Sequence, residues 1–212
     1  MKLVIIKYNA GNIQSVLYAL ERIGASAVVT DEPFEIVAAD KVIFPGVGEA
    51  STAMDYLRER GLDSLICGLR QPVLGICLGM QLMCSYSEEN DTECLGIFGE
   101  RVKRFAPGGD DPDGRESRGS GRGRGAGFKV PQIGWNNIYG LKTPLFQGVA
   151  EGSYCYFVHG YYAAPGDHTI ARTDYVQEYS SGLHRDNFYG VQFHPEKSAQ
   201  TGERILKNFL AL

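Results

Sequence analysis

A cysteine between two glycines is the clearest sign of chemistry in this sequence. Residues 75–79 read Gly-Ile-Cys-Leu-Gly, with an apolar run before them and a helix-like run, residues 80–83, after them. A sharp turn of this kind between a strand and a helix lifts the side chain of its nucleophile above the sheet and directs nearby backbone N–H groups at the group under attack. The helix N-terminus also favours the thiolate form of the thiol. Cys77 is therefore the predicted nucleophile, with a buried structural cysteine as the alternative.

Such a nucleophile needs a base to take its proton, and the base needs an acceptor that orients it. Of the four histidines, His168 and His184 lie in polar, turn-like stretches and are interpreted as surface residues, whereas His159 lies in an aromatic strand and fits a core position. His194 follows an apolar run, and Glu196 lies two residues further on, where its carboxylate can reach the second imidazole nitrogen. We predict that these two residues form a triad with the cysteine; the alternative is an exposed polar loop.

These residues need a fold that brings distant parts of the chain together. Apolar runs alternate with segments of helical spacing, so strands are expected at residues 2–7, 27–30, 41–45 and 72–76 and helices at 13–23, 51–60 and 62–69, with a further helix opening at Pro33. This alternation predicts a mostly parallel sheet with helices on both faces, a three-layer α/β/α fold. In such sheets the site lies beyond the carboxyl ends of the strands, so the turns at 8–12, 45–48 and 75–79 should meet there.

The second half of the chain predicts a small antiparallel portion. Aromatic and apolar runs indicate strands at residues 101–105, 154–159, 168–173, 178–183 and 188–193, and an amphipathic helix at 202–212. Between them, residues 107–127 are rich in Gly, Arg and Asp and cannot bury apolar area, so a flexible surface insertion is expected. Its Gly121–Gly125 stretch is similar to RNA-binding RG repeats, but nearby aspartates offset the arginines, so nucleic-acid contact is the minor alternative.

Composition narrows the class of protein. The 212 residues fit a single domain, and a net charge of −4 with a pI of about 5.6 argues against nucleic-acid binding. The apolar N-terminal run is too short for a signal peptide, and no run approaches the roughly 18 residues of a membrane span. The five cysteines are odd in number and lack CxxC spacing, which predicts neither a disulfide framework nor a zinc site. We therefore expect a cytoplasmic protein with a free Cys77, no metal and no cofactor.

Several motifs resemble those of one enzyme family. The cysteine turn, which continues into Met80-Gln81, and the His194-Pro195-Glu196 motif are similar to those of the class I (triad) glutamine amidotransferases. Within that family, the chain resembles the HisH glutaminase subunits of imidazole glycerol phosphate synthase in four further stretches: Tyr8–Asn12, Pro45–Gly48, Pro131–Asn136 and Tyr156–Tyr161. The resemblance covers almost the whole chain except 107–127. Two positions depart from the family pattern, since Lys7 replaces a common aspartate and Gly160 replaces a small hydroxyl residue.

The resemblance implies a flavodoxin-like fold and the hydrolysis of L-glutamine to glutamate and ammonia through a thioester on Cys77. The backbone N–H of Leu78, which follows the nucleophile, can stabilise the oxyanion. The resemblance assigns the second oxyanion donor to the turn at Gly46 and Val47. One form of this assignment requires a peptide of the turn to flip before its N–H can reach the oxyanion. It places the bound glutamine at four further residues: Gly48, Gln81, Gly160 and Tyr161.

The resemblance also implies a partner. Free ammonia would be protonated and lost in water, and the family passes it through a tunnel to a HisF-like (β/α)8 cyclase subunit. That subunit makes imidazole glycerol phosphate and an aminoimidazole carboxamide ribotide in histidine biosynthesis. Four positions of this chain correspond to the interface of the heterodimer: Asn12, Trp135, Tyr156 and Lys197. Exposed tryptophan and tyrosine are good interface anchors, and core packing is the alternative for both.

Other functions stay open at this point. The chain could serve a different amidotransferase, such as anthranilate synthase or pyridoxal phosphate synthase, although the Pro45–Gly48 and Pro131–Asn136 stretches argue against both. A cysteine protease-like or redox-stress protein with the same turn would need neither Glu196 nor an ammonia acceptor. A catalytically silent binding subunit would not need Cys77, His194 and Glu196 together.

Overall fold

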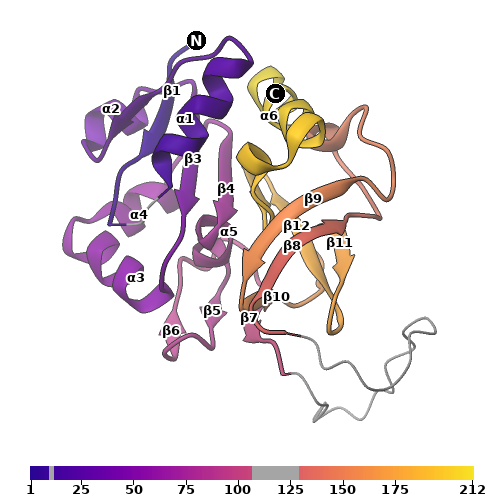
Figure 1. The fold of residues 1–212 in the computed structure, drawn as a ribbon. Helices are drawn as coiled ribbons and strands as arrows, with labels where there is room; N and C mark the ends of the chain where they lie inside the picture. Colours follow the sequence, from indigo (N-terminus) through magenta and orange to yellow (C-terminus); the bar gives the residue numbers. More distant parts are fainter. Residues whose placement is uncertain (10–11, 107–128) are drawn as a thin grey trace, which may run out of the picture.

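Five parallel strands form the part of the sheet that carries the cysteine. The computed structural model describes residues 1–9, 12–106 and 129–212 of the 212-residue chain. The strands lie in the order β2-β1-β3-β4-β13, of which Figure 1 labels β1, β3 and β4. They are β1 (Leu3–Ile6), β2 (Val28–Thr30), β3 (Lys41–Gly46), β4 (Val73–Cys77) and β13 (Phe188–Val191). All pairings among them are parallel. Their carboxyl ends therefore share one edge, where the end of β13 lies beside the end of β4.

Antiparallel strands extend the sheet beyond β13. Each of the next three is antiparallel to the one before it: β12 (Glu178–Arg185), β10 (Tyr161–Ala163) and β7 (Arg101–Arg104). Three more strands complete this end: β5 (Tyr86–Ser87), β6 (Thr92–Glu93) and β11 (Thr169–Asp174), the last paired with β12. Strands β8 (Gln132–Asn137) and β9 (Tyr154–His159) form a separate two-stranded ribbon (Figure 1). The predicted α/β fold with an antiparallel portion is confirmed.

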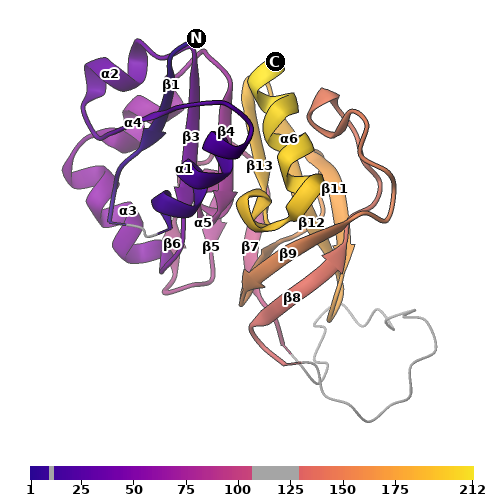
Figure 2. The same cartoon turned by 45° about the horizontal axis from the view of Figure 1, so that its top comes forward.

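Helices cover both faces of the parallel strands. Helices α1 (Ile13–Arg22) and α6 (Ala199–Ala211) lie on one face (Figure 2). The other face carries α2 (Pro33–Val37), α3 (Ala50–Glu59), α4 (Leu62–Cys67) and α5 (Leu78–Met83). Alternate residues of a strand enter the two layers: Val42 and Phe44 of β3 pack with the second group of helices, and Ile43 packs with the first. This alternation gives the three predicted layers.

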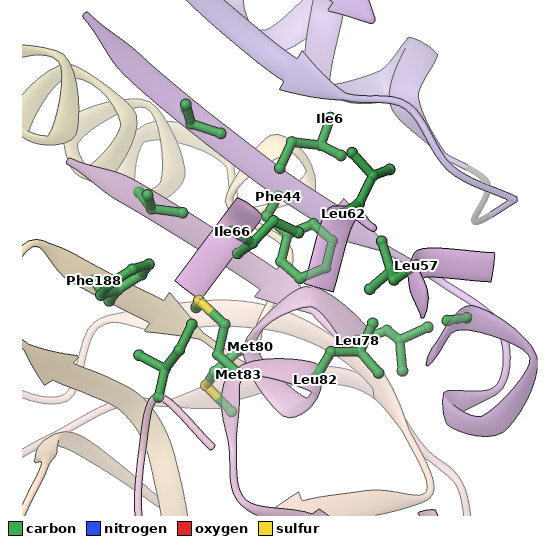
Figure 3. Close-up of a cluster of buried hydrophobic side chains, with 14 of the residues drawn as sticks. Ile6, Phe44, Leu57, Leu62, Ile66, Leu78, Met80, Leu82, Met83 and Phe188 are labelled. Atoms are coloured by element: carbon green, nitrogen blue, oxygen red, sulfur yellow. The ribbon is translucent and has the colours of Figure 1, made fainter. Parts of the chain in front are cut away.

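A cluster of buried side chains holds the helix that follows the cysteine. All six residues of α5 are buried. Its Leu78, Met80 and Met83 belong to the same cluster as Phe44 of β3 and Leu57 of α3 (Figure 3). Full burial of such a side chain stabilises the fold by about 1.5–3 kcal/mol. The helix is therefore anchored along its whole length, which gives the cysteine turn a fixed base.

Most predicted elements agree with the structure to within one or two residues. Helix α6 is an exception, because it begins at Ala199 and the predicted helix began at Gly202. Gly202 therefore lies inside the helix, at a close contact where a Cβ would be 1.8 Å from the backbone oxygen of Pro195. Strands β5, β6 and β10 are two or three residues long, too short for an alternating pattern to predict them. Two 3₁₀ turns, η1 (Pro144–Phe146) and η2 (Pro195–Lys197), complete the elements. The predicted insertion at 107–127 lies outside the described residues, and none of the described helices is long and apolar enough to cross a membrane.

Candidate active site

Cys77 occupies a strained turn between β4 and α5. Its φ of 54° and ψ of −109° are rare for a residue that carries a side chain. Both flanking glycines are needed, because an added Cβ would meet backbone atoms. A Cβ on Gly79 would lie 1.8 Å from the carbonyl oxygen of Phe44, and one on Gly75 would lie 2.9 Å from the backbone nitrogen of Met80. The predicted strand-turn-helix geometry is therefore present, and close packing on both sides holds the cysteine in it.

His194 faces Cys77 from the segment that follows β13. Nδ1 of His194 lies 2.8 Å from Oε1 of Glu196, and both side chains are buried. The carboxylate accepts the Nδ1 hydrogen, which leaves Nε2 for the cysteine. Burial works against a charged imidazole, but the charge and hydrogen bond of Cys77, together with Glu196, raise the pKa of His194 to about 10. The structure thus brings the three predicted triad residues together, with an imidazolium beside the sulfur.

Residues at both ends of α1, the N-cap Asn12 and the last residue Arg22, contact Glu196. Nδ2 of Asn12 donates to Oε1 of Glu196 at 2.7 Å, and Nη2 of Arg22 donates to the backbone oxygen of Glu196 at 3.3 Å. Asparagine at an N-cap normally bonds to the first turn of its own helix, yet the side chain of Asn12 makes no such cap. Its amide holds the triad instead. This contact was not predicted, and the place of Asn12 in a partner interface stays a prediction.

A pocket of about 220 Å³ opens over Cys77 and His194. It is smaller than the roughly 300–1,000 Å³ of sites for drug-sized ligands, so it suits a molecule of amino-acid size. Six residues predicted for substrate or oxyanion contacts line it: Val47, Gly48, Leu78, Gln81, Gly160 and Tyr161. Gly46, predicted for the same role, does not line the pocket. It is the last residue of β3, pairs with Cys77 in the sheet and packs against the hydroxyl of Tyr8.

Comparisons with known proteins agree with this geometry. The family described as glutamine amidotransferase class-I matches residues 4–212. The chain is 56% identical to the imidazole glycerol phosphate synthase subunit HisH of Bacteroides fragilis and 52% identical to that of Bacteroides thetaiotaomicron, with 100% of each chain covered. The chain belongs to the class-I glutamine amidotransferase family. A solved structure called glutamine amidotransferase has a TM-score of 0.69 at 17% identity, covering 98% of this chain and 97% of that one, which shows the likeness of fold alone.

The pocket of this amidotransferase contains one carboxylate that was not predicted. Glu89 lines the pocket, and its Oε2 accepts the backbone N–H of Ala50, the first residue of α3, at 2.8 Å. Burial raises the pKa of Glu89, and the hydrogen bond from Ala50 opposes this shift. Glu89 belongs to a short polar stretch between β5 and β6. Neither its spacing nor its neighbours in the sequence distinguish it from an ordinary turn residue.

The other histidines of the amidotransferase differ from His194. His159 also lines the pocket, but it is buried, with Nδ1 2.7 Å from a backbone carbonyl oxygen and Nε2 3.2 Å from the hydroxyl of Tyr179. Burial lowers the pKa of His159 to about 4, so its ring is neutral. His168, interpreted as a surface residue, is partly exposed, and its Nδ1 lies 2.9 Å from the buried Glu100, a contact that was not predicted. His184 is partly exposed as well.

The residues predicted for a partner interface lie on the ribbon and at the pocket. Trp135 of β8 is 53% exposed, and its ring makes an edge contact with Tyr156 of β9 at 5.8 Å. The alternation and register of the strands place Ile133 and Tyr154 on the same face of the ribbon as Trp135 and Tyr156. Both are exposed, and neither was predicted as an interface residue. Lys197 lines the pocket itself. Because β9 ends at residues that line the pocket, this apolar face of the ribbon borders the active site.

Proposed function

We propose that this chain is the glutaminase subunit of an imidazole glycerol phosphate synthase, which hydrolyses L-glutamine and passes the ammonia to a HisF-like cyclase subunit. The observation that carries the glutaminase activity is the set of Cys77, His194 and Glu196 at a pocket of amino-acid size. The choice among amidotransferases is supported by two relatives more than 50% identical, both named HisH.

The pocket carries groups that are complementary to glutamine. Glu89 supplies a carboxylate for the α-ammonium group, and a bound cation would favour the ionised form that burial disfavours. The side-chain nitrogen of Gln81 donates to the backbone oxygen of Tyr161 and to Oε1 of Gln192, both at 2.9 Å. Its side-chain oxygen therefore remains to accept a hydrogen bond from the substrate. The backbone of Gly160 can contact the glutamine where the family carries a hydroxyl residue.

The reaction begins with attack of the Cys77 thiolate on the side-chain amide carbon of glutamine. The carbonyl oxygen becomes an oxyanion, and the imidazolium of His194 gives its proton to the departing nitrogen, which leaves as ammonia. A glutamyl thioester remains on the sulfur. His194, now neutral, takes a proton from water, and the resulting hydroxide attacks the thioester to release glutamate and restore the thiolate. Glu196 keeps the ring in the tautomer that both proton transfers require.

The oxyanion needs two N–H donors, and the two differ in how firmly the surrounding structure holds them. The N–H of Leu78 lies at the start of the anchored helix α5. The resemblance assigned the second donor to the turn at Gly46 and Val47, but Gly46 does not line the pocket, so we place this donor at Val47 and Gly48. These two residues also line a second hollow, together with Asn9 and Thr52. Gly48 has a φ of 122° and open space around its Cα. The turn thus has room to change its peptide orientation, and one missing donor raises the barrier by about 3–4 kcal/mol, so the partner could control activity here.

Ammonia must then reach a second active site without meeting water. The apolar face of the ribbon, with Trp135 and Tyr156, borders the pocket and supplies aromatic anchors for the HisF-like barrel. Asn12 and Lys197 complete the proposed contact surface. We place the complex in the cytoplasm, because the cysteines of the chain are all unpaired, as expected in a reducing compartment.

Glutaminase assays with and without the barrel subunit and its nucleotide ligand test the proposal. We expect slow hydrolysis by the isolated chain, strong activation by the liganded partner, and complete loss in Cys77→Ala. Cys67→Ala is the matched control, because Cys67 is exposed and away from the pocket, and it should retain full activity. Activity that survives Cys77→Ala, or the absence of hydrolysis under every condition, would contradict the proposal. Equal activity with and without the partner would contradict control at the turn.

A further inference from the structure

One fully buried side chain beside Cys77 has no role in the mechanism so far. Gln192 is 0% exposed and follows β13 directly. Strand β13 pairs with β4 in parallel up to Val191 and Ile76, so the next position brings Gln192 level with Cys77. Its Nε2 lies 3.7 Å from Sγ of Cys77, within range for a hydrogen bond to sulfur. A buried amide of this kind requires partners for its polar atoms.

The orientation of this amide follows from a chain of hydrogen bonds. The backbone oxygen of Tyr161 can only accept, so the group of Gln81 that faces it at 2.9 Å must be the NH₂. The same NH₂ faces the Gln192 side chain at 2.9 Å, so Gln192 must present its oxygen there. The NH₂ of Gln192 then has to point at the sulfur. The reverse orientation would place two donors against each other and leave the sulfur facing an oxygen.

We infer that Gln192 is a catalytic residue that donates a hydrogen bond to Sγ of Cys77 and stabilises the thiolate, with Gln81 fixing its direction. The inference rests on the proposed function, because it adds a group to the same nucleophile. In the proposed mechanism His194 is charged whenever the sulfur is a thiolate and is neutral only while the sulfur is held in the thioester. Gln192 adds a second donor to the thiolate, and as a neutral amide it keeps its hydrogen throughout the cycle.

Alkylation of Cys77 by iodoacetamide tests the contact without any partner protein. Peptide mass spectrometry of the full chain from pH 5 to 9 gives the pH midpoint of Cys77 alkylation, since only the thiolate reacts. We expect Gln192→Met to move this midpoint up by about one unit, because hydrogen bonds to charged groups have roughly tenfold or larger effects on such equilibria. Gln192→Glu keeps the size and the acceptor for Gln81 but sets a carboxylate against the sulfur, so the midpoint should rise further.

Controls separate this effect from general damage. Gln71→Met removes a comparable amide, bonded to the backbone oxygen of Ile36 at 2.9 Å and away from the pocket, and should leave the midpoint unchanged. Exposed Cys67 serves as an internal reference in every sample. The other ionisable groups near the sulfur, His194, Tyr8 and Tyr179, are identical in all variants. In glutaminase assays kcat should fall in the Gln192 variants with little change in KM, because the amide touches the nucleophile.

The outcomes distinguish this inference from the proposed function. If Cys77 reacts in the parent chain and both Gln192 variants reproduce its pH profile, the inference is wrong and the glutaminase proposal stands. If Cys77 in the parent chain does not react while Cys67 does, the nucleophile itself is misassigned and the glutaminase proposal fails. If Gln192→Met does not fold, as judged by circular dichroism, the isosteric Gln192→Glu decides the question alone.

Discussion

Two walls of the same pocket are built in opposite ways. On one wall, the Cys77 turn is packed so closely that a Cβ on Gly79 would lie 1.8 Å from a backbone oxygen. On the other, the turn at Val47 and Gly48 has a hollow on each side, and a Cβ on Gly48 would meet nothing within 4 Å. Both turns follow neighbouring strands, β4 and β3. Packing, rather than position in the fold, therefore distinguishes the two walls, and we expect the first to be rigid and the second to have room to move.

In the proposed mechanism, this difference assigns the chemistry to the Cys77 turn and the control to the turn at Val47 and Gly48. A nucleophile must keep its geometry, since a misplacement of 1 Å can cost about 100-fold in rate. An oxyanion turn with space around it can adopt two peptide orientations, and only one of them needs to be active. The following changes test whether the two walls behave as differently as their packing indicates.

The largest effect is expected from Gly79→Ala on the rigid wall. The new methyl group would collide with the carbonyl oxygen of Phe44, so either α5 or β3 must shift by more than 1 Å. We expect glutaminase activity to fall at least about 100-fold and the free energy of unfolding to drop by about 1–3 kcal/mol or more. Urea unfolding and assays with the partner measure both. Gly68→Ala, where a Cβ makes only 3.5 Å contacts, should change neither; an active, stable Gly79→Ala would show that the turn is not rigid.

Gly48→Ala on the open wall should separate activity from stability. The φ of 122° strains a residue with a side chain, although no atom is close enough to collide, so we expect a loss of about 1–3 kcal/mol in unfolding free energy. Activity with the partner should fall about 100-fold if the turn can no longer supply its donor. Gly24→Ala is the matched control, with a φ of 77° and equally open space but a position at the end of α1. It should lose similar stability and keep its activity.

The triad residues could be predicted from the sequence, whereas the contacts that Asn12 and Gln192 make with them could not. The glycines around Cys77 and the motif at His194 and Glu196 are local patterns that report directly on a turn and on a proton acceptor. Asn12 is different, because its contact with Glu196 joins residues 184 positions apart. Gln192 reaches Cys77 across 115 positions, through a strand pairing that no local pattern specifies. Such residues become visible only when the register of the sheet and the direction of each side chain are known.

The ribbon side of the pocket should show a pH effect on stability through His159, the last residue of β9. The pKa of His159 is lowered to about 4 in the folded protein, against 6.5 in an unfolded chain. Below pH 6.5, His159 is therefore protonated in the unfolded chain but stays neutral in the folded protein. The free energy of unfolding decreases as the pH falls toward 4. The full effect is about 3 kcal/mol. His194 acts in the opposite direction, because its pKa is raised from 6.5 to about 10. The stability that it contributes is fully present below pH 6.5 and decreases as the pH rises above that value, and the comparison of the parent chain with a His159 variant removes this shared contribution.

Urea unfolding of the parent chain and of His159→Gln at pH 7.5 and pH 4.5 measures this contribution. The parent chain should lose more unfolding free energy between the two pH values than the variant, by up to about 3 kcal/mol. Equal losses would mean that His159 gains its proton without cost, and hence that the ribbon side of the pocket opens to water.

The smallest effect concerns the base of the open wall, where Tyr8 packs under Gly46. Among the described residues, the buried hydroxyl of Tyr8 has no hydrogen-bond partner, and burial with the nearby Cys77 raises the pKa of Tyr8 well above its usual value, so it stays protonated. Removing an unsatisfied buried hydroxyl should stabilise a protein, so Tyr8→Phe should gain about 1 kcal/mol in urea unfolding. Tyr179→Phe is the opposite case, because the hydroxyl of Tyr179 donates to Gln132 at 2.9 Å, and it should lose about as much. A loss in Tyr8→Phe would mean that the hydroxyl has a hydrogen-bond partner in solution.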